Sequence, residues 1–460
     1  HEINLIMSMQ RRADCQVSIR HDGLKRFTLV LVVIPRERFA PGVRLRIQTA
    51  VEKLLGMTPG SAEFKLAVSD DPLARIYFTF PNPSYSAHSM DEAELATAIS
   101  EIIFTWDDKT LALIKTRQLR ELRHKFKTFY AAALSPEYKA ATKVEVAISD
   151  LVVLEQLAAA DAIEITLEPQ VGDAAASEGP IFDLRIFKRG AALTLSALLP
   201  MLENAGLEIL RESVFTLKAA DGSTWATIYS FAVRFEASNT GATMLDETVV
   251  QEYFIPGLKS ILRGGSESDR LNSLLLKPGV SLEHIAILRV IQKYLWQIKA
   301  VSSPVSVITA LTRNPELTKE LIDFFIAKFR PRSASEQGEL ATAERKRALT
   351  QLKESFLNSL KNVADLDDDR ALRVAFNVIE SIVRTNYYRE HRGAAISFKI
   401  DCQSINAMPL PRPRFEIFVS GPNFDGIHLR GGKVARGGLR WSERHDDYRT
   451  EFLGLMKTQM

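Results

Sequence analysis

The feature that most constrains the fold is an order of secondary-structure patterns that occurs twice along the chain. The first occurrence begins with a continuous apolar, β-branched run at 27–34, the pattern of a buried strand. A helical pattern that begins at Pro41 follows, and then two strand patterns at 61–68 and 75–80. The second occurrence has a strand pattern at 182–186, a helical pattern at 194–204, and strand patterns at 208–217 and 225–235.

This repeated β-α-β-β order predicts an α+β protein with two ferredoxin-like modules, joined and followed by long helical segments. We expect five segments. They are a first module with trailing helices at 1–135, a helical connector and linker at 136–179, a second module at 180–243, a helical region at 244–393, and a segment at 394–460 in which strand patterns return.

A glycine- and arginine-rich stretch at 430–441 is the clearest candidate for a binding site. Two Gly-Gly pairs flank Arg436, the second of them at Gly437 and Gly438. Glycine allows the backbone to approach a ligand closely, and a guanidinium presents a fixed fork of donors that suits a carboxylate or phosphate. The alternative is a glycine-rich hairpin with solvated basic side chains, and the spacing alone does not decide between the two.

The stretch 430–460 resembles the substrate-binding stretch of glutamate dehydrogenases, most closely that of the large NAD-specific bacterial class. The smaller hexameric enzymes carry Lys-Gly-Gly-Leu-Arg-Phe and then a helix with Leu-Gly-Phe. This chain carries Arg-Gly-Gly-Leu-Arg-Trp at 436–441 and Leu-Gly-Leu at 453–455. The preceding residues resemble the long N-terminal extension of the large class, and the two modules resemble ACT domains. The resemblance therefore implies an ACT-containing extension followed by the first strands of a truncated α/β catalytic domain.

The resemblance implies that the parent protein converts L-glutamate, NAD and water to 2-oxoglutarate, ammonia and NADH. Arg436 would replace the lysine with which the hexameric enzymes hold a substrate carboxylate, with Gly437 and Gly438 beside it. Arg440 matches the arginine of the family motif, where it would contact substrate or hold the loop. Lys457 is the lysine nearest to the family's second carboxylate-binding position.

The family's catalytic lysine would lie beyond Met460, and so would the NAD-binding domain. No G-x-G-x-x-G sequence follows a strand pattern in this chain. We therefore expect no catalytic and no cofactor-binding residue within the chain. We expect no metal site either, because His445 has no second ligand at metal spacing. The chain begins with His1 and ends within a helical pattern, so we expect a piece of a longer polypeptide.

Three acidic residues, Glu443, Asp446 and Asp447, lie at the start of the helical pattern that runs to the end of the chain. Carboxylates in such a group are able to serve as acid–base catalysts. We interpret them instead as charges that interact favourably with the positive end of the helix dipole.

The composition excludes several classes of partner. A net charge of +3 provides no basic footprint for nucleic acid, and no apolar run approaches the ~20 residues that span a membrane. Cys15 and Cys402 form no metal or redox motif, which favours a reduced, cytoplasmic chain. A second hypothesis is that the chain itself is an ACT-type module that senses an amino acid or serves as a scaffold. We expect a homo-oligomer in either case.

Overall fold

The structure is a computed structural model of the chain, and it divides into two compact units, His1–Val152 and Val153–Met460. The residues that it describes are 15–24, 26–68, 72–81, 92–157, 159, 161–170, 179–236, 246–277, 279–332, 339–389, 395–422, 424–431, 434–440 and 448–458.

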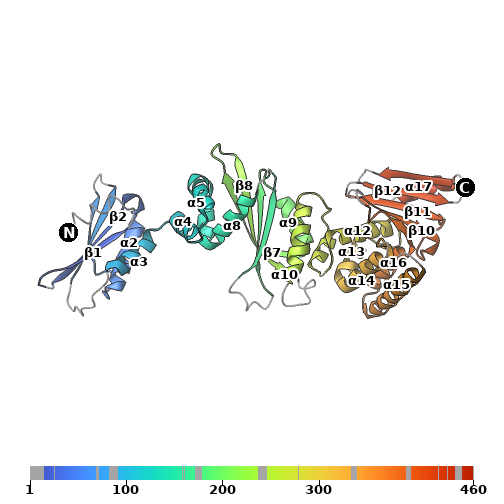
Figure 1. Cartoon of the computed structure of the whole chain (residues 1–460), viewed down its shortest axis with the longest axis horizontal. Coiled ribbons are helices and arrows are strands. Elements are labelled where there is room, and N and C mark those ends of the chain that lie inside the picture. The colour runs from blue at the N-terminus through green and yellow to red at the C-terminus, as the bar shows by residue number, and fades with distance from the viewer. Residues whose placement is uncertain are drawn as a thin grey trace. The chain divides into compact units, whose positions relative to one another are not determined.

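A four-stranded antiparallel sheet, in the order β1-β2-β4-β3, forms the first module together with the helices packed on it (Figure 1). The elements of this module are β1 (Gln16–His21), β2 (Phe27–Pro35), η1 (Arg36–Arg38), α2 (Pro41–Leu54), β3 (Glu63–Val68), β4 (Leu73–Pro81) and α3 (Glu92–Ile103). The two α-helices cover one face of the sheet, where Ile47 and Ile99 share a core with Phe78. Leu31 and Val33 are buried on the opposite face, which is why β2 is apolar along its whole length.

The predicted β-α-β-β order of the first module is confirmed, and α3 follows it, but an additional strand, β1, precedes it. β1 pairs antiparallel with β2 and takes the edge position that a ferredoxin-like module fills with its last strand. The sheet therefore keeps the ferredoxin-like strand order while its edge strand comes from the start of the module. β1 was not predicted, because its sequence, QVSIRH, is short and mostly polar.

Short helices complete the first unit. They are α4 (Trp106–Thr116), α5 (Arg120–Lys125), η2 (Phe126–Tyr130), α6 (Ala131–Ala133), α7 (Pro136–Ala141) and α8 (Val144–Gln156), the last of which ends in the second unit. Thr105 and Asp108 form a reciprocal capping box at the start of α4. The buried Tyr138 hydroxyl donates a hydrogen bond to Asp150, which ties α7 to α8.

The second unit begins with a module of the same topology, whose antiparallel sheet has the order β5-β6-β8-β7. Its elements are β5 (Ile163–Pro169), β6 (Phe182–Arg189), α9 (Leu195–Asn204), β7 (Leu207–Lys218), β8 (Thr224–Phe235), α10 (Glu247–Val249), η4 (Val250–Phe254) and α11 (Ile255–Leu262). The predicted helix and three strands of this module are confirmed. β5 was not predicted, because its Ile-Glu-Ile-Thr-Leu alternation lies in a stretch that reads as connector and linker.

A helical region follows the second module. It contains η5 (Arg270–Leu276), α12 (Leu282–Gln297), α13 (Pro304–Arg313), α14 (Pro315–Phe329), α15 (Glu339–Ser359), η7 (Leu360–Asn362) and α16 (Leu366–Ser381). Ser281 and His284 form a capping box at the start of α12. The Asp365 side chain caps α16, and the acidic residues that follow it lie in the first turn, where they favour the helix dipole.

The chain ends in a five-stranded antiparallel sheet and a helix. These elements are β9 (Ile382–Thr385), β10 (Ile396–Asp401), η8 (Cys402–Ser404), β11 (Phe415–Gly421), β12 (Phe424–Gly431), β13 (Val434–Arg440) and α17 (Tyr448–Lys457). Neighbouring strands follow chain order, and α17 packs on β12 and β13. One apolar core extends from the second module through the helical region into this sheet, so all three parts of the second unit are packed together.

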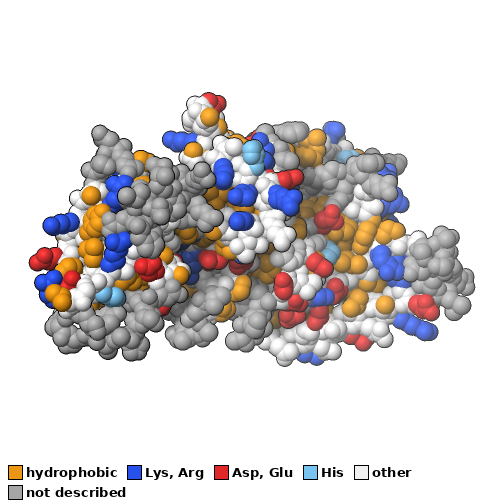
Figure 2. All heavy atoms as spheres, turned by 60° about the vertical axis from the view of Figure 1, so that its left-hand side comes forward, with side chains coloured by type: hydrophobic (Ala, Val, Ile, Leu, Met, Phe, Trp, Pro, Cys, Tyr) orange, Lys and Arg blue, Asp and Glu red, His pale blue; other side chains and the backbone are white. Residues whose placement is uncertain are grey.

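The surface carries charges of both signs. Basic and acidic side chains both lie on the face that Figure 2 draws, as expected for a net charge of +3. Among the helices that the structure describes, none combines the length and the apolar character that crossing a membrane requires.

A test of the core packing uses Gly257 on α11. A Cβ at Gly257 would come within 2.6 Å of Cδ1 of the buried Leu275. We expect Gly257→Ala to lower the free energy of unfolding by about 1–3 kcal/mol, because overpacking forces neighbours out of their preferred rotamers. Gly454→Ala on α17 is the matched control, since the space around Gly454 is open. It should raise the free energy of unfolding by up to about 1 kcal/mol. Equal effects in urea unfolding would contradict this account.

Candidate functional site

Arg436 lies on β13, an edge strand of the C-terminal sheet. The pairing with β12 places Arg436 opposite Leu429, and Gly438 opposite Ile427. Leu429 and Ile427 are buried in the core of the second unit. Because directly paired residues project from the same face of a sheet, Arg436 and Gly438 belong to this covered face. Arg436 is half-buried there.

Close packing accounts for both glycines that follow Arg436. A Cβ at Gly437 would lie 2.6 Å from the carbonyl oxygen of Ile427, so only glycine lets β13 approach β12 at this point. A Cβ at Gly438 would overlap the ring of Phe452, which α17 places against the strand. The backbone at Gly438 is therefore covered by an aromatic ring, whereas the sequence predicted that a ligand could approach it closely.

The other predicted site residues are placed differently. Arg440 is paired with Asp425 in the strand register, and the conformation of its side chain lies outside the described residues. Lys457 is exposed in the last turn of α17, where a positive charge favours the helix dipole. Among the described residues, no hydrogen bond or ion pair joins Arg436 to Lys457. The acidic residues Glu443, Asp446 and Asp447, with His445, also lie outside the described part of the chain.

A buried polar network holds α17 against the sheet. The Tyr294 hydroxyl of α12 donates a 2.6 Å hydrogen bond to Oε2 of Glu416 on β11. Arg449 of α17 donates from Nε to Oε1 of the same carboxylate at 3.0 Å. The three side chains are almost completely inaccessible to solvent, with 0% exposure for Tyr294 and Glu416 and 1% for Arg449. The carboxylate therefore joins three elements that are far apart in the sequence.

The sequence contains only a partial signal for this network. In β11, Glu416 alternates with Phe415 and Ile417, a pattern that places the acidic residue on the opposite face from its apolar neighbours. That pattern normally marks a solvated face. Here the face bearing Glu416 is the buried one, because α12 and α17 cover it. Strand periodicity alone does not reveal that a helix arginine neutralises the carboxylate.

The tyrosines near the network are held in their neutral form. Burial raises the pKa of Tyr294 well above its usual value, and the Glu416 carboxylate raises it further. Burial likewise raises the pKa of Tyr448, with a further contribution from Asp425. The Tyr448 hydroxyl is buried and has no hydrogen-bond partner among the described residues. Both phenols therefore keep their protons at neutral pH, and the Tyr294 hydroxyl uses its proton in the bond to Glu416.

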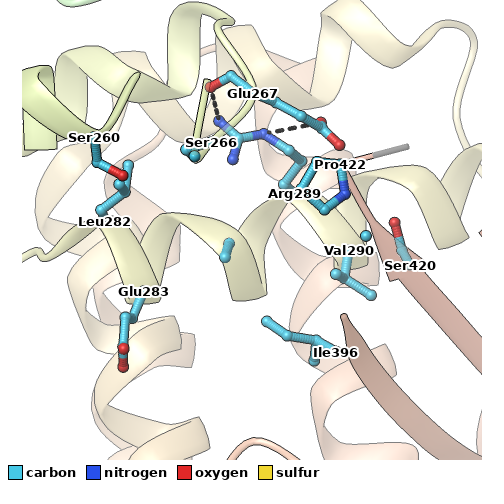
Figure 3. Close-up of a pocket in the computed structure, with 13 residues that line it drawn as sticks. Ser260, Ser266, Glu267, Leu282, Glu283, Arg289, Val290, Ile396, Ser420 and Pro422 are labelled. Carbon is cyan, nitrogen blue, oxygen red and sulfur yellow. Dashed lines mark hydrogen bonds and ion pairs between the residues drawn. The ribbon is translucent and has the colours of Figure 1, made fainter. Parts of the chain in front are cut away.

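A cavity of about 260 Å³ lies within the second unit (Figure 3). Its wall comes from the loop after α11, from α12, and from β10 and β11, and includes Glu267, Arg289 and Ser420. Arg289 is only 5% exposed and donates from Nε to Asp269 at 2.6 Å, and it also lies 3.4 Å from Glu267. These ion pairs neutralise the guanidinium inside the protein.

Lys293 connects this cavity to the C-terminal sheet. Its Nζ lies 2.8 Å from Oε1 of Glu267, 3.3 Å from Oγ of Ser420 and 3.8 Å from Oδ1 of Asp425. Ser420, Asp425 and Arg440 are directly paired across β11, β12 and β13. Lys293 therefore interacts both with Glu267, in the loop after α11, and with the row of paired strand residues that includes Arg440.

The sequence matches four models of glutamate dehydrogenase regions. Their descriptions are "Glutamate dehydrogenase, ACT2 domain" at 16–107, "Glutamate dehydrogenase, ACT3 domain" at 166–247, "Glutamate dehydrogenase, helical motif 3" at 266–331, and "Bacterial NAD-glutamate dehydrogenase, catalytic domain" at 355–460. The chain is thus similar to bacterial NAD-glutamate dehydrogenases in regions spread along most of its length. This confirms the resemblance on which the sequence analysis relied, including the two ACT modules.

Curated relatives support the same assignment along the whole chain. The NAD-specific glutamate dehydrogenase of Halomonas elongata is 32% identical over 99% of this chain, and that of Mycobacterium tuberculosis is 32% identical over 96%. The enzyme of Pseudomonas aeruginosa is 29% identical over 99%. The chain spans 27% of the length of each of these relatives. The α+β architecture with ACT modules therefore corresponds to one part of these longer relatives.

The Glu416 network allows a sharp test of stability. Glu416→Ala leaves the Arg449 guanidinium buried without its counter-ion, which should cost about 3–5 kcal/mol in the free energy of unfolding. The double variant Glu416→Leu/Arg449→Met removes both charges and should lie within about 2 kcal/mol of the wild type, because apolar side chains of similar volume replace a buried ion pair at little cost. Urea unfolding measures both. A double variant as unstable as the single one would contradict the network's role.

Proposed function

We propose that this chain is part of an NAD-dependent glutamate dehydrogenase, which converts L-glutamate, NAD and water to 2-oxoglutarate, ammonia and NADH. The observation that carries the proposal is the match of residues 355–460 to the catalytic domain of the bacterial enzymes. That match contains β13 and α17, the elements that carry the predicted substrate-binding residues. The names of the curated relatives support the same reaction and the same cofactor.

In this proposal Arg436 holds a carboxylate of the substrate. Its half-buried position supports the role, because a charge that is partly shielded from water attracts an anion more strongly than a fully solvated one. The close β12–β13 approach at Gly437 and the Phe452 ring over Gly438 fix the strand that carries the guanidinium. Arg440 and Lys457 are further candidates for the second carboxylate.

We place the catalytic lysine and the NAD site outside residues 1–460. The strand pairs that the structure describes are antiparallel in all three sheets. Dinucleotides in α/β folds bind at the carboxyl ends of parallel strands. We propose that the segment 394–460 begins the catalytic domain. Regulation and assembly are the proposed roles of the four segments before it, 1–135, 136–179, 180–243 and 244–393. The strand β5 belongs to the second module.

The ACT matches favour a second role for the same chain. We propose that the ACT modules sense an amino-acid effector or mediate assembly of a cytoplasmic homo-oligomer, without catalysis of their own. Calorimetric titration of the purified chain with the common amino acids distinguishes the two versions. Heat from one amino acid supports sensing, and no heat from any of them leaves the scaffold role.

The reaction is tested with two proteins. The full-length parent, incubated with L-glutamate and NAD, should produce NADH at a rate that depends on both. Residues 1–460 alone should produce none above the level of a mock purification, because we place the catalytic lysine and the dinucleotide fold elsewhere. A full-length protein that binds neither glutamate nor NAD would refute the proposed reaction. Activity of the isolated chain would refute the placement of the catalytic groups.

Substitution of Arg436 in the full-length enzyme tests its role. Arg436→Ala should lower kcat/KM for glutamate about ten- to a hundredfold, because a charge-assisted hydrogen bond contributes about 1.5–3 kcal/mol. The KM for NAD should change little, and Arg436→Lys should recover part of the loss. Lys457→Ala tests a candidate for the second carboxylate in the same assay, and unchanged glutamate kinetics would remove that candidate. If Arg436→Ala lowers stability and leaves glutamate kinetics unchanged, the arginine is structural.

A further inference from the structure

A second cavity, of about 420 Å³, lies between α14 and α15, and the glutamate dehydrogenase proposal does not use it. Its size is that of a site for a small molecule. Three arginines line it: Arg330 and Arg332, which follow the end of α14, and Arg345 of α15. Apolar atoms of Ile326 and Ala327 complete the same wall. The cavity therefore combines several guanidinium groups with an apolar surface.

Two of the arginines, Arg332 and Arg345, have few partners within the described part of the chain. Arg345 donates from Nη2 to the carbonyl oxygen of Arg330 at 2.7 Å, and Arg332 donates from Nη1 to the Thr342 hydroxyl at 3.0 Å. Within the part of the chain that the structure describes, neither Arg345 nor Arg332 forms an ion pair. Most of the hydrogen-bond donors of these two guanidiniums are therefore available to a ligand.

The carboxylates that line the cavity do not balance the charges of Arg332 and Arg345. Asp323 and Glu344 also line the cavity, and Asp323 is paired with Lys319 at 2.8 Å. The remaining lining carboxylate, Glu344, is one negative charge against the two positive charges of Arg332 and Arg345. Bringing like charges together around a cavity is unfavourable unless an anion enters it. Elsewhere in the second unit the contrast is clear, since Arg289 and Arg449 each contact a carboxylate.

We propose that this cavity binds a small organic anion. Arg332 and Arg345 would hold its phosphate or carboxylate group, because a guanidinium donates two parallel hydrogen bonds to either group. Ile326 and Ala327 would contact the apolar portion of the ligand. The site lies on the helical region, so it is separate from the residues that we propose for glutamate.

Calorimetric titration of the purified chain with three probes tests the site. Phenyl phosphate and phenylacetate carry the same ring with different anionic groups, and inorganic phosphate has no apolar portion. At least one ring-bearing probe should bind, and inorganic phosphate should bind at least about tenfold more weakly because it buries no apolar surface. Preference for phenyl phosphate assigns a phosphate ligand, and preference for phenylacetate assigns a carboxylate. Absence of binding by all three at millimolar concentration would overturn the proposal.

Variants locate the site. Arg345→Gln and Arg332→Gln should each weaken the bound probe about tenfold or more, because each removes a charge-assisted hydrogen bond. Arg347→Gln is the control on the same helix, since Arg347 is exposed and does not line the cavity. It should change the affinity by no more than about twofold. Thermal unfolding confirms that each variant is folded. Equal weakening by all three substitutions would show a general charge effect and would overturn the site.

Discussion

The contact between Arg449 and the buried Glu416 carboxylate determines how the C-terminal part of this chain is arranged. Glu416 lies in the middle of β11, and through Tyr294 it is also bonded to α12. A buried carboxylate that lost these partners would carry a large desolvation penalty, so α12, β11 and α17 must come together for any of them to be stable. The position of α17 is therefore fixed by charge as well as by apolar packing.

The position of α17 in turn controls the strand that carries Arg436. Phe452 of α17 lies against Gly438, and Gly437 allows β13 to approach β12 closely. These glycines are explained by packing, and the same packing makes β13 a well-defined support for a guanidinium. The two interpretations of the glycine-rich stretch, structural hairpin and substrate site, are thus compatible. The hairpin exists, and a half-buried arginine projects from its covered face.

Much of the fold follows from the sequence, for identifiable reasons. The strand at 27–34 and the helix that begins at Pro41 were predictable because apolar runs and proline at a first turn are local signals. β1 and β5 were missed because edge strands bury little, so their patterns are weak. The contact between Glu416 and Arg449 could not be predicted from the sequence. Periodicity describes each element by itself and does not say which elements pack together. The packing of Phe452 against Gly438 is also a tertiary contact, so it could not be predicted for the same reason.

The central claim is that the packed β13–α17 pair presents Arg436 to a substrate carboxylate. An experimental structure of the full-length enzyme with bound glutamate tests it most directly. The account predicts that Arg449 remains bonded to Glu416, that Phe452 lies against Gly438, and that the Arg436 guanidinium is within hydrogen-bonding distance of a substrate carboxylate. A structure in which both substrate carboxylates are held by other residues, while Arg436 contacts only protein atoms, would contradict it.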